Sequence, residues 1–84
     1  MDEKDFELLR ILGETRNITH AADKLYMTQS ALSKRIKALE RELGVEIMLR
    51  SRQGIRFTPA GEKVLAHSKA AAHEMEQLRR GLDS

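Results

Sequence analysis

The stretch ITHAADKLYMTQSALSKRIKALEREL, residues 18–43, predicts two helices joined by a short turn. Thr19 and Thr28 each precede a helix-forming run, so each hydroxyl is expected to cap a helix by accepting a hydrogen bond from an early backbone N–H. Tyr26 and Met27 are expected to fill the turn between the two helices. A short helix, a tight turn and a longer helix are typical of a helix-turn-helix.

The longer helix has one apolar and one polar face. Its apolar residues share one stripe of a 3.6-residue period; they are Leu32, Ile36, Leu39 and Leu43. The opposite stripe combines short hydroxyls with long cations, at Ser30, Ser33, Lys34, Lys37 and Arg41. Arg35 lies nearer the side and is placed to pair with an acid such as Glu42.

Size and composition exclude several classes of protein. The 84 residues make one small domain with a modest core. Cysteine is absent, which excludes disulfides and thiolate chemistry and is compatible with a reducing cytoplasm. No apolar run approaches the roughly 18 residues of a membrane span, and the acidic start is unlike a secretion signal. We therefore expect a soluble, cytoplasmic chain with no membrane contact.

The net charge of +2 is unevenly distributed. Residues 1–27 hold four cations and six anions, residues 28–56 hold seven and three, and residues 57–84 hold four of each. The cationic surplus therefore coincides with the longer helix and the segment after it, as expected where a polyanion binds. Ordinary solvated charge is the alternative explanation.

The flanking segments predict two more boundaries. Residues 2–16 form an expected amphipathic helix with an apolar face of Phe6, Leu8, Leu9 and Leu12. Asn17 is expected to take the left-handed conformation that ends this helix. Gly44 is expected to end the longer helix in the same way.

Residues 45–57 change to a period of two. Ile47 and Leu49 precede the loop SRQG, and Ile55 and Phe57 follow it, so a small β-hairpin is expected. Its cations are Arg50, Arg52 and Arg56.

A fourth helix is expected over residues 59–82, because Thr58 and Pro59 combine an N-cap residue with a first-turn proline. Coiled-coil spacing then links Val64, Ser68, Ala71, Met75, Leu78 and Leu82. We expect this seam to pair with a second copy of the chain. Packing on the chain's own first helix is the alternative.

Together these motifs resemble the N-terminal DNA-binding domain of bacterial LysR-type transcriptional regulators, directly over about residues 4–65. The markers are Ala21-Ala22, Leu25, Thr28-Gln29-Ser30-Ala31-Leu32-Ser33, Ile36, Leu39-Glu40, Leu43-Gly44, Arg50 and Thr58-Pro59-Ala60-Gly61. Ser30 stands where many relatives carry proline, and Met48 where phenylalanine is common. The resemblance implies a mainly α fold: a winged helix-turn-helix of three helices and a β-hairpin wing in residues 1–58, then a linker and dimerisation helix in residues 59–84.

The resemblance also implies partners. They are double-stranded DNA at an inverted repeat, a second subunit bound through the linker helix, and higher oligomers of the full-length protein. A small-molecule effector would bind only through a separate C-terminal domain outside this sequence, which therefore looks like a DNA-binding fragment.

The DNA-binding residues expected from periodicity and resemblance together are Thr28, Gln29, Ser30, Ser33, Lys34, Lys37, Arg50 and Arg52. The base-reading role of Gln29 rests on the resemblance, and an ordinary helix surface is its alternative. For Arg50 and Arg52 the alternative is exposed charge on a hairpin.

An enzyme and a winged helix that binds protein or RNA are the rival functions. An enzyme is disfavoured: His67 and His73 are six positions apart, not the three or four that place two metal ligands on one helix face, and His20 is alone. We therefore expect no catalytic residues, no metal and no cofactor. A winged helix that binds protein or RNA is the second rival. The hydroxyls and cations of the exposed face favour DNA over a protein partner.

Overall fold

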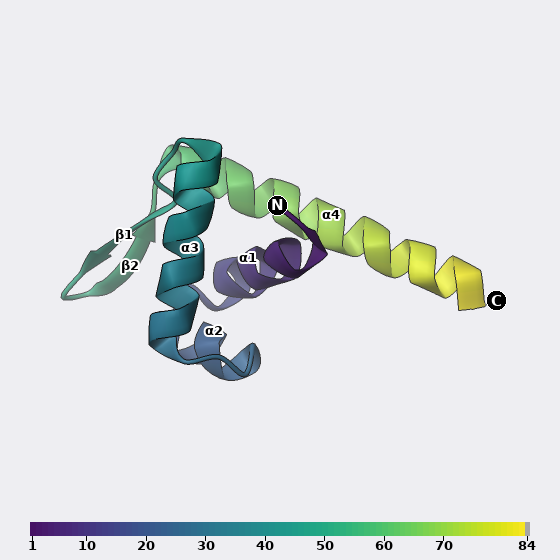
Figure 1. The fold of residues 1–84 in the computed structure, drawn as a ribbon, viewed down its shortest axis with the longest axis horizontal. Helices are drawn as coiled ribbons and strands as arrows, with labels where there is room; N and C mark the ends of the chain where they lie inside the picture. The colour runs from purple at the N-terminus through teal and green to yellow at the C-terminus, as the bar shows by residue number, and fades with distance from the viewer. Residues whose placement is uncertain (84) are drawn as a thin grey trace.

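The computed structural model describes residues 1–83 and confirms a mainly helical fold with a two-stranded hairpin (Figure 1). The elements within these residues are α1 (Glu3–Thr15), α2 (Ile18–Lys24), α3 (Gln29–Leu43), β1 (Met48–Ser51), β2 (Gly54–Phe57) and α4 (Pro59–Asp83). None of the helices in this part of the chain is long and apolar enough to cross a membrane.

The first three helices and the start of α4 share one apolar core. Its buried side chains are Leu8, Leu9, Leu12, Ala21, Ala22, Leu32, Ile36, Leu39, Ile47 and Leu65. The predicted apolar stripe of α3 is confirmed for its first three members. Leu43 is 40% exposed, because it is the last residue of α3 and lies past the core.

The helix boundaries correct two expectations. Arg16, not Asn17, takes the left-handed conformation after α1, with φ 49°. Asn17 instead caps α2, its side chain accepting from the His20 backbone N–H at 3.0 Å, so Thr19 lies inside the helix. An Asn caps a helix at least as well as a Thr, which places the start before Thr19. The predicted Thr28 cap is confirmed at 3.0 Å to the Ala31 N–H.

The turn between α2 and α3 also differs from expectation. Tyr26 does not fill it: the side chain is 98% exposed and φ is 56°. The Met27 N–H donates to the Ala22 carbonyl at 2.9 Å, which is the six-to-one bond of a Schellman motif. In that motif the left-handed residue points outward while the next one, Met27, packs against the core.

The hairpin, which we call the wing, is antiparallel, with Met48 opposite Phe57 and Arg50 opposite Ile55. Met48, Ile55 and Phe57 pack against the core. Leu49 does not share the buried position of Ile47 that the period of two predicts: it is 51% exposed, and Met48, opposite Phe57, packs against the core instead.

The start of α4 is fixed against the segment before β1. The Thr58 hydroxyl accepts from the Gly61 N–H at 2.8 Å, which confirms the predicted cap, while the Thr58 N–H donates to the Ile47 carbonyl at 3.1 Å. A Cβ on Gly61 would lie 2.0 Å from the Ile47 carbonyl oxygen, so only glycine fits this approach.

Beyond its first turns, α4 packs along α1. Phe6 and His67 meet edge to face with ring centroids 5.8 Å apart. Ser68 is fully buried and donates to the Val64 carbonyl at 2.8 Å. The alternative of packing on the chain's own first helix is therefore realised for this part of α4, whereas its last turns project beyond the other elements (Figure 1).

Arg16 joins three elements at the other end of α1. Its guanidinium lies 4.9 Å from the Phe57 ring centroid and bonds both carboxylate oxygens of Glu62, at 2.7 and 3.0 Å. These contacts connect the end of α1 to the wing and to α4.

Candidate nucleic-acid interface

The polar face of α3 is open to solvent along its length. Thr28, at the N-cap, is also exposed. The exposed predicted contacts on the helix itself are Gln29, Ser30, Lys34 and Lys37, and Arg41 continues the row. The structure therefore gathers these hydroxyl, amide and cationic groups on one helix.

The wing extends this surface. Arg50 donates from Nη2 to the Oγ of Ser33, which brings two predicted contacts together across β1 and α3. Arg52 lies in the hairpin turn and is exposed. In Figure 1 the wing lies beside α3, on the side opposite α1. The DNA-binding roles of all these residues stay predictions.

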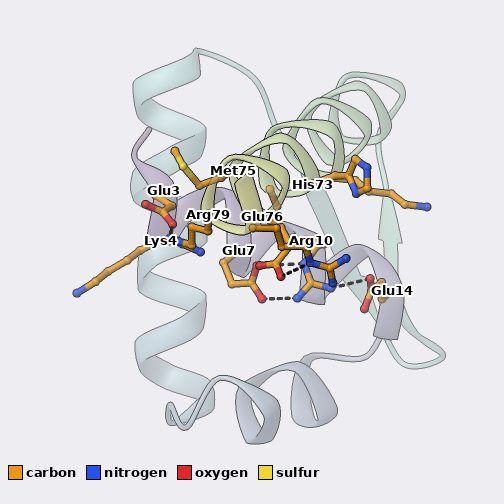
Figure 2. A pocket seen from close by; sticks show the side chains of 12 residues that line it. Glu3, Lys4, Glu7, Arg10, Glu14, His73, Met75, Glu76 and Arg79 are labelled. Atoms are coloured by element: carbon orange, nitrogen blue, oxygen red, sulfur yellow. Dashed lines mark hydrogen bonds and ion pairs between the residues drawn. The ribbon is translucent and has the colours of Figure 1, made fainter. Parts of the chain in front are cut away.

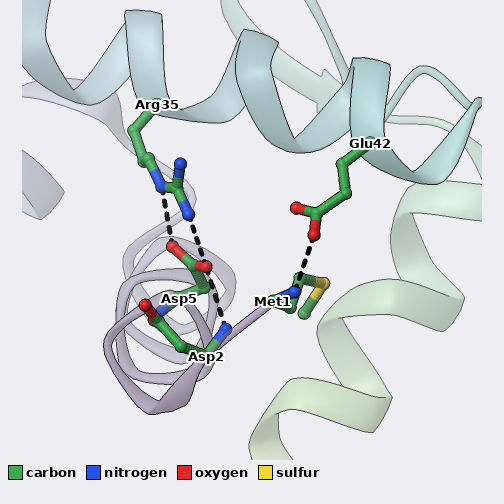
Figure 3. A network of polar contacts seen from close by, with 5 residues as sticks. All are labelled: Met1, Asp2, Asp5, Arg35 and Glu42. Carbon is green, nitrogen blue, oxygen red and sulfur yellow. Dashed lines mark hydrogen bonds and ion pairs between the residues drawn. The ribbon is translucent and has the colours of Figure 1, made fainter.

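Arg35 pairs with an acid, as expected, but its partner is Asp5 and not Glu42. Figure 3 shows that the Arg35 guanidinium donates two hydrogen bonds to the carboxylate of Asp5 in α1. They run from Nε to Oδ1 at 2.8 Å and from Nη2 to Oδ2 at 2.6 Å. Glu42 instead accepts from the Met1 ammonium at 2.9 Å, which raises the pKa of that amine. The Arg35 guanidinium, helped by the Asp2 backbone N–H, holds the pKa of Asp5 below its ordinary value.

Asp5 was missed by the sequence analysis, although a signal was present. It occupies the same face of α1 as Leu8, Leu9 and Leu12, and it is only 3% exposed. A carboxylate on a buried stripe requires a cationic partner.

Glu40 is a second side chain that sequence reasoning left without a role. Its Oε2 accepts from the Ile47 N–H at 2.7 Å, so the last turns of α3 hold the segment that leads into the wing.

A groove of about 820 Å³ separates α1 from the distal half of α4 (Figure 2). Arg10 spans Glu7 and Glu14 on its α1 wall, and these carboxylates raise its pKa. Arg79 pairs with Glu3 across the groove. Among residues 1–83 no cluster of three or more His, Asp and Glu side chains is placed to hold a metal ion.

The predicted dimer seam is partly buried against α1 and partly exposed to solvent. Val64 is half-buried and Ser68 is buried inside the chain, so these two lie in the part of α4 that packs on α1. The remaining members lie further along, with Ala71 and Met75 half-buried and Leu78 and Leu82 exposed by 54% and 74%.

Comparison with known proteins identifies this architecture. The family model described as "Bacterial regulatory helix-turn-helix protein, lysR family" matches residues 4–62. The chain belongs to this LysR family. The match covers the helix-turn-helix of this family, which is a family of regulatory proteins and not of enzymes.

Relatives and solved structures agree with the family match. The chain is 36% identical over 83 residues to the uncharacterized HTH-type transcriptional regulator YkuM of Bacillus subtilis, covering 99% of this chain and 28% of YkuM. It is 43% identical over 79 residues to the HTH-type transcriptional regulator HdfR of Salmonella newport, covering 90% and 28%. The chain thus spans less than a third of the length of these relatives.

Two structures show the same fold. The BenM_DBD complex with catB site 1 DNA matches with a TM-score of 0.91 and 26% identity, covering 99% of this chain and 93% of that one. Full-length OxyR C199D from Pseudomonas aeruginosa matches with a TM-score of 0.88 and 29% identity, covering 99% and 28%. The BenM_DBD match confirms the winged helix-turn-helix fold.

Proposed function

We propose that this chain binds double-stranded DNA in the bacterial cytoplasm, with α3 as the recognition helix in the major groove and the wing on the backbone or in the minor groove. The exposed row of hydroxyls, amide and cations on α3, continued by Arg50 at Ser33, carries this proposal. A major groove about 12 Å wide admits an α-helix. The similarity to BenM_DBD, whose structure is a DNA complex, supports it.

The contacts divide into base readers and phosphate ligands. Gln29, in the first turn of α3, has an amide that both donates and accepts, as an adenine edge requires. Ser30, Ser33 and Lys34 follow it toward bases or nearby phosphates. Thr28 adds a hydroxyl where the free N–H groups of the α3 N-terminus attract a phosphate.

The cations further from the first turn bind the backbone. Lys37 and Arg41 lie along the distal half of α3, where the helix leaves the groove floor. Arg50 and Arg52 reach the sugar-phosphate chain or a narrow minor groove, which attracts arginine.

A homodimer would place two copies of α3 on one operator. The distal part of the seam offers the exposed Leu78 and Leu82 and the half-buried Ala71 and Met75 to the same helix of a second copy, and Val64 and Ser68 would continue it at the α1 contact. Two recognition helices about 34 Å apart, or a multiple of this, then read an inverted repeat. Higher oligomers and effector binding would belong to the full-length protein and its C-terminal domain.

A binding assay with random duplex pools tests the proposal. We expect enrichment of an inverted repeat and an affinity that falls linearly with salt on logarithmic axes. Replacing Lys34 and Lys37 by Gln should weaken binding and flatten this slope. The matched control, Lys63→Gln with Lys69→Gln on α4, removes the same charge away from α3 and should leave the slope unchanged. Equal affinity for any polyanion, or equal effects of both pairs, would contradict the proposal.

A further inference from the structure

One cation of α3 is held by another helix. Lys34, Lys37 and Arg41 are exposed and make no ion pair with the residues that the structure describes. Arg35, between them in the sequence, is paired with Asp5. The cationic strength of α3 toward DNA therefore depends on whether this pair holds.

The pair is built more firmly than a surface salt bridge. Asp5 is 3% exposed. Its carboxylate accepts two hydrogen bonds from the Arg35 guanidinium and one from the Asp2 backbone N–H at 3.0 Å. Asp5 is itself the third residue of α1 and a member of its capping box, so its carboxylate is fixed on the helix. Forked and charge-assisted bonds of this kind are the strong ones.

The direction of the pair matters for DNA. Asp5 lies on α1, and α1 lies on the side of α3 opposite the wing (Figure 1). Figure 3 shows the Arg35 side chain extended toward α1. About 100° separates Arg35 from Lys34 around the helix, so a long arginine side chain that is released from Asp5 can turn toward the backbone that Lys34 faces. Its side chain is already 41% exposed.

We propose that Asp5 is a positioning residue that withholds Arg35 from DNA phosphates and so limits the sequence-independent part of DNA binding. This inference rests on the proposed function. Phosphate contacts raise affinity for every sequence alike, whereas base contacts discriminate. An acid on α1 thereby sets how many cations α3 contributes to non-specific binding.

The salt dependence of binding gives the sharpest test. Each added phosphate contact steepens the logarithmic slope by about 0.9, so between 50 and 200 mM salt Asp5→Asn should lose about 3.5-fold more affinity than the wild type. At the lowest salt, Asp5→Asn should bind random duplexes more tightly than the wild type. Arg35→Gln should keep the wild-type slope, because Arg35 does not touch phosphate while Asp5 holds it. The double variant should also return to that slope.

Two matched variants complete the experiment. Glu7→Gln removes the same charge from α1, but Glu7 pairs with Arg10 on its own helix, so its slope should equal that of the wild type. Asp5→Glu keeps the charge and should restore the wild-type slope. Circular dichroism confirms that each variant is folded before it is titrated.

Three results would overturn the inference. Equal slopes for Asp5→Asn and Glu7→Gln would show that Asp5 does not withhold a cation. If Asp5→Asn binds DNA more weakly with an unchanged salt slope, the Asp5–Arg35 pair only stabilises the fold. A shallower slope for Arg35→Gln would show that Arg35 already contacts phosphate, and this result does not depend on the folding of any Asp5 variant. If the wild type itself fails to bind duplex DNA, the proposed function fails instead.

Discussion

Arg50 in β1 donates to the hydroxyl oxygen of Ser33 in α3, so the wing and α3 are bonded to each other within the protein. Arginine has only donors, so Ser33 accepts here and its own O–H remains available to donate. A purine N7 or a phosphate oxygen is the matching acceptor on DNA. The two predicted contacts therefore act as one unit.

The first prediction concerns this unit. Ser33→Ala and Arg50→Gln should each weaken DNA binding, and the double variant should lose less than the sum, with a coupling of at least about 0.5 kcal/mol. Affinity titrations of the four proteins on one duplex measure it. Ser33→Ala combined with Arg52→Gln is the control and should be additive, because Arg52 lies in the hairpin turn. If both pairs of substitutions are additive, Ser33 and Arg50 do not act together in DNA binding, which would contradict the prediction.

The second prediction concerns base reading by Gln29. Gln29→Ala should cost about 1–3 kcal/mol on the preferred operator and flatten the preference at one base-pair position. Ala removes the amide and leaves the α3 cap at Thr28 in place, so the helix should persist. Titration of variant half-sites measures the change. If base preference at every position stays as in the wild type, Gln29 is an ordinary surface residue.

The local pattern of the sequence sufficed for some of these features and not for others. The 3.6-residue period identified Leu32, Ile36 and Leu39 as core because burial on a helix follows that spacing. The same reasoning predicted Thr19 as the cap of α2 where Asn17 caps it, because both residue types form caps and the pattern permits either start.

Contacts between distant segments were beyond the sequence pattern. Asp5 and Arg35 are 30 positions apart, and nothing local indicates that α1 and α3 meet there. Tyr26 points outward because a Schellman bond formed by its neighbour fixes the backbone, a geometry that the residue types alone do not specify. The grouping of the candidate contacts was more predictable than these packing details, since their residues share one helix and one hairpin, while their DNA-binding roles stay predictions.

The third prediction concerns Gly61. Gly61→Ala should lower the free energy of unfolding by about 3 kcal/mol, because the added Cβ would overlap the Ile47 carbonyl, which is fixed by the Thr58 N–H. Chemical denaturation measures this loss. Gly81→Ala is the matched control on the same helix. A Cβ there meets no atom within 4 Å, so stability should stay the same or rise by up to about 1 kcal/mol. Equal stability of the two variants would contradict the close approach.

The fourth prediction is a pH dependence of stability. The folded-state pKa of Asp5 is lowered chiefly by Arg35, so its contribution is fully present above the ordinary value of 3.8 and is lost as pH falls through the folded-state pKa. At pH 6, Asp5→Asn should lower the free energy of unfolding by about 1–2 kcal/mol, and the difference should shrink below pH 4. Urea titrations across this range measure it. A difference that stays constant with pH would mean that the Asp5 charge does not stabilise the fold.

The fifth prediction concerns the projecting end of α4. Met75→Glu with Leu78→Glu should give monomers in sedimentation experiments, because paired acids on a helical seam repel their counterparts in a second copy. The control, Ala70→Glu with Gln77→Glu, adds the same charge at exposed positions off the seam and should leave dimers intact. The seam variant should also lose the advantage of an inverted repeat over a single half-site while keeping its half-site affinity, since each monomer retains α3 and the wing. If the seam variant still forms dimers, the interface lies elsewhere. If it loses half-site binding, α4 is also needed for DNA binding by α3 and the wing.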